Sequence, residues 1–107
     1  MEKVKILYKP EVEDFFVNLV LLLFREDYFS YLENAESYKN NIIDFVENSI
    51  TTFPSYKTPL KLIDFGSNYI FYKSNSRTTW FVFFEKHKSN YLVTHIINNH
   101  CEEAKWL

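Results

Sequence analysis

Residues 77–97 read RTTWFVFFEKHKSNYLVTHII, and this stretch decides the fold. Two runs rich in aromatic and β-branched residues, 77–85 and 91–97, flank the polar segment 87–90. A short polar connection between two such runs is typical of an antiparallel hairpin. Trp80 alternates with Val82 and Phe84, which predicts that its ring packs in the core. The segment is therefore expected to form two antiparallel strands.

The residues upstream extend this pattern. Residues 69–73 are joined to the hairpin by Ser74-Asn75-Ser76, another short polar turn. Residues 60–65 are expected to form one strand with 69–73, or a bulged pair around Gly66. We place His95 on the face of Tyr91 and Val93, because all three share the alternation of the last strand.

The first half of the chain combines one strand with two helices. Residues 3–8 alternate as a strand does, and Pro10 followed by acidic residues marks a helix to about residue 26. That helix carries a second apolar patch of Val17, Val20, Leu21 and Phe24, so it needs two covering surfaces. A second helix over residues 33–51 is expected to form one of these covering surfaces, and the sheet is expected to form the other.

We predict one α+β domain over residues 1–107. Its order is strand, helix, helix and a three-strand meander, with two helices on one face of a four-stranded, mainly antiparallel sheet in which the first strand pairs into the meander. The tail 98–107 is polar and is expected to make at most one helical turn.

Composition excludes several classes of protein. The single glycine in 107 residues excludes the glycine-rich loops that hold nucleotide phosphates, so no cofactor is expected. The apolar run 15–24 is too short for a membrane span. His95, His100 and Cys101 match no zinc-ligand spacing, and no metal is expected. One cysteine and no cleavable leader predict a cytoplasmic protein.

Charge is divided unevenly along the chain. Residues 1–52 hold five Lys/Arg and ten Asp/Glu, a net charge of −5, and residues 53–107 hold seven and four, a net charge of +3. A basic second half is suited to face a polyanion, although +3 is also ordinary scatter for a chain of this size.

The ordered set of segments resembles the RelE/ParE superfamily, the toxins of bacterial type II toxin–antitoxin pairs, also described as plasmid-stabilisation proteins. The resemblance rests on the opening KVKILY of residues 3–8 with Pro10, on the order of elements, and on residues 69–73 and 77–84. The last strand, 91–97, followed by Asn98, Asn99 and His100, completes it.

The resemblance implies a toxin that a cognate antitoxin covers until it is needed. RelE-like members cut messenger RNA on the ribosome without a metal, and ParE-like members inhibit DNA gyrase. The family's basic strand residues correspond to Lys73 and Arg77, and its polar exit from the last strand to Asn98, Asn99 and His100. Val17, Leu21 and Phe24 are the expected antitoxin contacts.

RNA cleavage through the 2′-hydroxyl needs a base, an acid and a cation on the phosphate. We assign proton transfer to His100 and phosphate binding to Arg77 and Lys73. Lys61, Asn98 and Asn99 are expected RNA contacts, and Tyr72 or Trp80 is expected to stack an unpaired base.

One departure from the family keeps an alternative open. The residues after His100 read CEEAK, acidic where the RNA-cleaving members are basic. A gyrase inhibitor, or a non-catalytic antitoxin-binding module, is therefore the second hypothesis. The non-functional alternatives are that Arg77 is only a solvent-exposed residue at the end of a strand and that His95 is a core residue.

Overall fold

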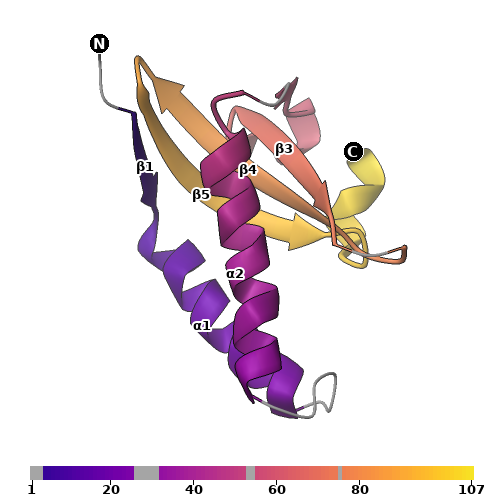
Figure 1. The fold of residues 1–107 in the computed structure, drawn as a ribbon. Coiled ribbons are helices and arrows are strands. Elements are labelled where there is room, and N and C mark those ends of the chain that lie inside the picture. Colours follow the sequence, from indigo (N-terminus) through magenta and orange to yellow (C-terminus); the bar gives the residue numbers. More distant parts are fainter. Residues whose placement is uncertain (1–3, 26–31, 53–54, 75) are drawn as a thin grey trace.

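The computed structural model describes residues 4–25, 32–52, 55–74 and 76–107, except for the side chains of 22–25 and 32–34. Figure 1 shows a twisted sheet with two long helices on one side. The elements in chain order are β1 (Lys5–Tyr8), α1 (Pro10–Arg25), α2 (Leu32–Ser49), β2 (Tyr56–Lys57), the 3₁₀-helix η1 (Leu60–Phe65), β3 (Asn68–Lys73), β4 (Thr79–His87), β5 (Asn90–Asn98) and the 3₁₀-helix η2 (Glu102–Trp106).

The sheet has five strands in the order β1-β5-β4-β3-β2. The pairs β2/β3, β3/β4 and β4/β5 are antiparallel, whereas β1 runs parallel to β5. The α+β class is confirmed, and the sheet is mainly antiparallel, with the first strand paired to the last strand of the meander. The prediction of four strands is wrong, because the two-residue strand β2 extends the edge beside β3. The parallel pairing of β1 makes the sheet mixed rather than wholly antiparallel.

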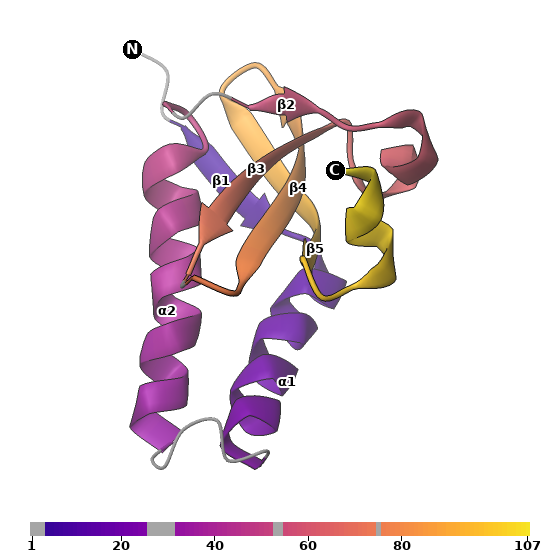
Figure 2. The ribbon, with the colours of Figure 1, turned by 90° about the vertical axis from the view of Figure 1, so that its right-hand side faces the viewer.

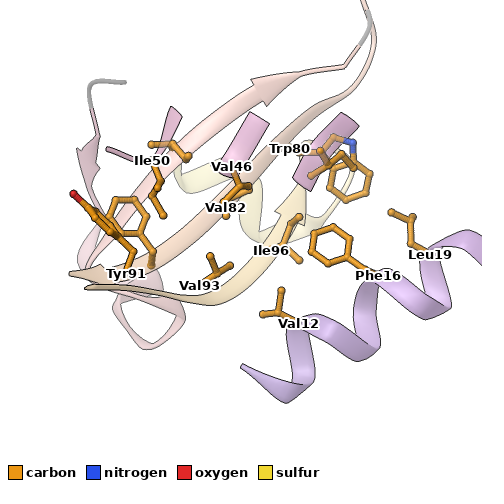
Figure 3. Close-up of a cluster of buried hydrophobic side chains, with 13 residues drawn as sticks. Val12, Phe16, Leu19, Val46, Ile50, Trp80, Val82, Tyr91, Val93 and Ile96 are labelled. Atoms are coloured by element: carbon orange, nitrogen blue, oxygen red, sulfur yellow. The ribbon is translucent and has the colours of Figure 1, made fainter. Parts of the chain in front are cut away.

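Both long helices pack on the same face of the sheet, as predicted. Pro10 begins α1, and the N–H groups of Val12 and Glu13 donate to the carbonyl of Lys9. Figure 3 shows side chains of both helices pointing at the sheet, where they form the main core. Its buried members are Val12, Phe16 and Leu19 of α1, Ile42, Val46 and Ile50 of α2, and Ile70, Trp80, Val82, Phe84, Tyr91, Val93 and Ile96 of the sheet.

The other face of the sheet is covered by the two 3₁₀-helices (Figure 2). Leu62 packs there against Phe83 and Ile97, and Leu107 adds to the same small cluster. The expected strand over residues 60–65 is therefore wrong, because η1 occupies them. The N–H of Leu62 donates to the carbonyl of Pro59, which starts a helical turn where a strand would have continued. The helical turn expected in the tail is present as η2.

A β-bulge between β4 and β5 changes which residues share a face. Phe84 pairs with Val93 and Phe83 pairs with His95, so Thr94 is an extra residue. Tyr91 and Val93 consequently face the helices, while the His95 ring stacks on Phe65 of η1. The prediction that His95 shares the face of Tyr91 and Val93 is wrong for this reason.

Candidate functional site

The tip of the β3–β4 hairpin and the exit of β5 meet at one end of the sheet (Figure 1). The N–H of Ser74 donates to the carbonyl of Thr78 at 3.0 Å and closes the turn between the strands. Lys73, the last residue of β3, pairs with Thr79, and both Lys73 and Arg77 are exposed. Two cations therefore lie on either side of one tight turn.

Asn99 holds the exit of β5 against this turn. Its side-chain Oδ1 accepts from the N–H of Thr79 at 2.9 Å, and its Nδ2 donates to the carbonyl of Arg77 at 3.0 Å. The N–H of Asn99 also donates to the carbonyl of Thr79 at 3.0 Å. Since its amide is bonded to the hairpin backbone on both sides, Asn99 positions the cluster.

His100 lies directly on the hairpin. Its Nε2 is 3.2 Å from Oγ1 of Thr78, with the donor set by the tautomer of the ring. The N–H of His100 donates to Oδ1 of Asn98 at 2.8 Å, and the thiol of Cys101 lies 3.6 Å from the same oxygen. The Asn98 side chain therefore turns the chain so that the exposed imidazole faces the hairpin.

Five predicted site residues thus come together, and we call them the hairpin-end cluster. They are Lys73, Arg77, Asn98, Asn99 and His100.

Two predicted RNA contacts lie elsewhere. Lys61 is on η1, where its Nζ stands 4.3 Å from the centre of the Trp106 ring. Tyr72 faces the helices and stacks on Phe45 at 4.9 Å between ring centres. Trp80, the other candidate for base stacking, is only 4% exposed and donates from Nε1 to the hydroxyl of Tyr38 at 2.9 Å. Neither Tyr72 nor Trp80 lies on the face that carries Lys73.

The hairpin-end cluster combines three chemical functions. Arg77 offers a planar set of donors that matches phosphate oxygens, and Lys73 adds a second positive charge. His100 supplies an imidazole, a side chain type that accepts and donates protons in catalysis. Glu102 and Glu103 follow closely, although the carboxylate of Glu102 pairs with Lys105 at 3.5 Å. The arrangement suits binding of a phosphodiester and one proton transfer.

A second surface lies on α1. Val17 and Leu21 are 62% and 50% exposed, so the expected antitoxin patch is uncovered there. The side chain of Phe24, its third predicted member, lies outside the described residues. Val17 also lines a groove of about 200 Å³ together with Tyr8, Phe16 and Ile43. The pKa of Tyr8 is raised by burial and by Glu47, whose carboxylate accepts from its hydroxyl.

Metal and membrane features are limited to negative findings. Within the ranges described, no group of three or more His, Cys, Asp or Glu side chains is arranged to hold a metal ion. In the same part of the chain, no helix has the length and hydropathy needed to cross a membrane.

Comparison with known proteins adds no relative. No family model, no curated protein and no solved structure matches this chain.

Sequence reasoning missed a group of aromatic side chains on the face opposite the long helices. Tyr56, Tyr69 and Phe71 lie there with Phe81, and their rings pack against one another across β2, β3 and β4. The alternation of Tyr69 and Phe71 with buried Ile70 was the available signal. Nothing in the sequence indicated that this part of the face stays uncovered.

Proposed function

We propose that the chain is the toxin of a type II toxin–antitoxin pair, related to RelE and ParE, which stops translation by cutting messenger RNA on the ribosome. One observation carries the proposal: the hairpin-end cluster brings together cations and an imidazole from segments more than 20 residues apart. The proposed toxin acts in the cytoplasm, where ribosomes are found.

The proposed reaction is a transesterification within the RNA. The 2′-oxygen attacks the adjacent phosphorus as its proton leaves, and the 5′-oxygen departs with a proton. The products are a 2′,3′-cyclic phosphate and a 5′-hydroxyl, and no oxidant or metal is required. Arg77 and Lys73 stabilise the charge that develops on the phosphate, and His100 carries one of the two proton transfers.

The α1 surface is the proposed antitoxin site. Val17 and Leu21 present an apolar strip on the solvent side of α1, next to the groove beside Tyr8. An amphipathic segment of the antitoxin buries such a strip with residues at helical spacing.

A second candidate function is a binding module without catalysis, such as a gyrase inhibitor. It is favoured by two exposed carboxylates, Glu102 and Glu103, that lie two and three positions after His100. They would repel a phosphate chain that approaches from the side of η2.

Induction of the protein in bacteria tests the first proposal. Wild-type protein should arrest growth and produce new RNA ends that mapping of transcripts detects. His100→Ala should slow cleavage about 10²- to 10⁴-fold, because a proton-transfer group is lost. Arg77→Ala should weaken cleavage by removing a phosphate contact. Thermal melts of the purified variants show whether they remain folded.

His87→Ala is the matched control, since His87 is an exposed histidine in the hairpin at the other end of β4. It should arrest growth like the wild type. Full arrest by folded Arg77→Ala and His100→Ala proteins would contradict cleavage and support the binding module.

A further inference from the structure

Four aromatic rings form a continuous strip on the face of the sheet opposite the long helices. We call Tyr56, Tyr69, Phe71 and Phe81 the aromatic strip. Tyr56 on β2 stacks on Tyr69 at 5.5 Å between ring centres, with 27° between the planes. Its ring also lies 5.7 Å from that of Phe71, which in turn lies 6.4 Å from Phe81.

The strip is open to solvent on one side. η1 and η2 cover Phe83 and Ile97, and the strip lies beside that covered area, toward the β2 edge. Tyr56 is 45% exposed and Phe71 36% exposed, whereas Tyr69 and Phe81 are half-buried beneath and beside them. Adjacent exposed aromatic rings on a sheet face are unfavourable in water unless another flat apolar surface covers them.

Positive charge borders the strip. Lys73 follows Phe71 by two positions on β3, so both side chains leave the same face of the strand about 7 Å apart. Lys57, the neighbour of Tyr56 on β2, leaves the opposite face of that strand and does not border the strip. Lys73 forms no ion pair within the described residues. Glu85, the nearby acid on β4, lies at the far end and accepts from the N–H of Ser67.

We infer that Tyr56 and Phe71 stack the unpaired bases of a single-stranded RNA whose phosphate backbone contacts Lys73. Flat rings beside a cation are the chemistry that binds single strands, because every base has a π-face and every nucleotide a negative charge. The choice of RNA rests on the proposed function. Lys73 belongs to both surfaces, so the aromatic strip leads a strand directly to the hairpin-end cluster.

Binding of a short oligonucleotide tests this inference apart from cleavage. The probe is a fluorescently labelled 12-nucleotide RNA with 2′-O-methyl sugars, which cannot be cut through its 2′-hydroxyls. Phe71→Leu and Tyr56→Leu should each weaken binding about 5- to 150-fold, because each removes one stacking face and retains apolar bulk. Phe71→Trp should bind at least as tightly as the wild type.

Tyr72→Leu is the matched control, because Tyr72 is the next residue on β3 but faces the helices. It should leave RNA affinity unchanged while it lowers the melting temperature. Lys73→Gln should weaken binding and reduce its dependence on salt. Wild-type affinity in folded Phe71→Leu and Tyr56→Leu proteins would overturn the inference, as would tighter binding of a DNA strand of the same sequence.

The proposed toxin function fails separately. If induction of the wild type causes no growth arrest but Phe71→Leu still loses RNA binding, the aromatic strip stands and the toxin does not. If growth arrest occurs and Phe71→Leu binds RNA normally, the toxin stands and the strip is overturned.

Discussion

Gly66 occupies a backbone conformation that side chains rarely adopt. Its φ of 155° and the close approach of the sheet leave no room for a Cβ, which would lie 2.5 Å from Oγ1 of Thr94 and 3.1 Å from the backbone nitrogen of Phe84. Gly66→Ala should therefore lower the free energy of unfolding by about 1 to 3 kcal/mol. Urea denaturation measures the change.

The double variant Gly66→Ala/Thr94→Ala separates the clash with the Thr94 side chain from the clash with the backbone of Phe84. It should recover only part of the loss, because the contact with the backbone of Phe84 remains and Thr94 gives up its hydrogen bond to the carbonyl of Phe65. Wild-type stability in the single variant would show that the chain relaxes at this point.

Trp80 is joined to α2 by packing and by a hydrogen bond. Its Nε1 donates to the Tyr38 hydroxyl, which also lies 2.9 Å from Oγ of Ser74 in the hairpin turn. Trp80→Ala should cost about 3 to 5 kcal/mol of stability and abolish activity only by unfolding the domain. Tyr38→Phe removes the hydroxyl alone, and should cost about 1 to 3 kcal/mol because buried donors lose their partner. Chemical denaturation of both variants measures these losses of stability. Equal losses in Trp80→Ala and Tyr38→Phe would contradict separate contributions from packing and from the hydrogen bond.

His95 makes stability depend on pH. Burial lowers the pKa of its imidazole, an effect that Lys9 adds to and Glu103 opposes. The unfolded chain, with a histidine pKa of about 6.5, then binds more protons than the folded chain just below that pH. The stability that neutral His95 contributes is present above pH 6.5 and is lost as pH falls through 6.5 toward the lower folded pKa.

Melting temperatures between pH 7.5 and 5 measure this contribution. The decline should be steeper for the wild type than for His95→Gln, because the variant lacks the imidazole. If the melting temperatures of the wild type and His95→Gln fall equally with pH, His95 does not make stability depend on pH.

The sequence indicated part of the candidate site through local geometry. Lys73 and Arg77 flank a short polar turn, and a strand that pairs with β4 must end beside that turn. Asn99 and His100, which only the family resemblance grouped with Arg77, lie beside that turn. Tyr72 could not be placed, because alternation along β3 fixes which residues share a face but not which face the helices cover.

At the scale of elements, α1 separates a buried stripe from an exposed one. Leu19 is 6% exposed and Leu21 50% exposed, two positions apart on one helix. Leu19→Ala should cost about 2 to 5 kcal/mol, whereas Leu21→Ala should change stability by less than about 0.5 kcal/mol. Denaturant titration of the pair measures the contrast. Equal losses of stability in Leu19→Ala and Leu21→Ala would mean that α1 is buried on both sides.

Co-expression of the antitoxin should raise the solubility of the wild-type protein. If Leu21 is an antitoxin contact, Leu21→Ala should lose this gain.

The elements that sequence reasoning missed are the short ones. The helix over 10–25 follows from Pro10, an acidic first turn and an apolar period, and the helix over 32–49 follows from its apolar period. β2 is two residues long and lies between Pro54 and Pro59, so it carries no period of its own. In η1, Leu60 and Leu62 are separated by the polar Lys61, which is the spacing of a strand. The hydrogen bond from the N–H of Leu62 to the carbonyl of Pro59 and the packing of Leu62 against the sheet accompany the helical turn instead.

At the scale of the whole molecule, the two faces of the sheet differ in how many apolar side chains they bury. Among the described residues, thirteen form the buried main core between the sheet and the two long helices, and three form the buried cluster between the sheet and η1 and η2. Because more apolar side chains are buried on the helical side, that side supplies most of the hydrophobic contribution to stability. The opposite side keeps exposed aromatic and basic residues, which a fully covered sheet could not offer to a partner.

This asymmetry predicts the order in which the molecule opens. Amides of η1 and η2 should exchange with solvent by local opening, because few buried contacts hold them, while the central amides of β4 and β5 should exchange only on global unfolding. Hydrogen exchange followed by mass spectrometry or NMR across a series of low urea concentrations measures both. Bound RNA on the aromatic strip should slow exchange in β2 and β3 and leave α2 unchanged. Protection of η1 equal to that of β4 would mean that the small cluster around Leu62 unfolds together with the main core, and that the second face is as rigid as the first.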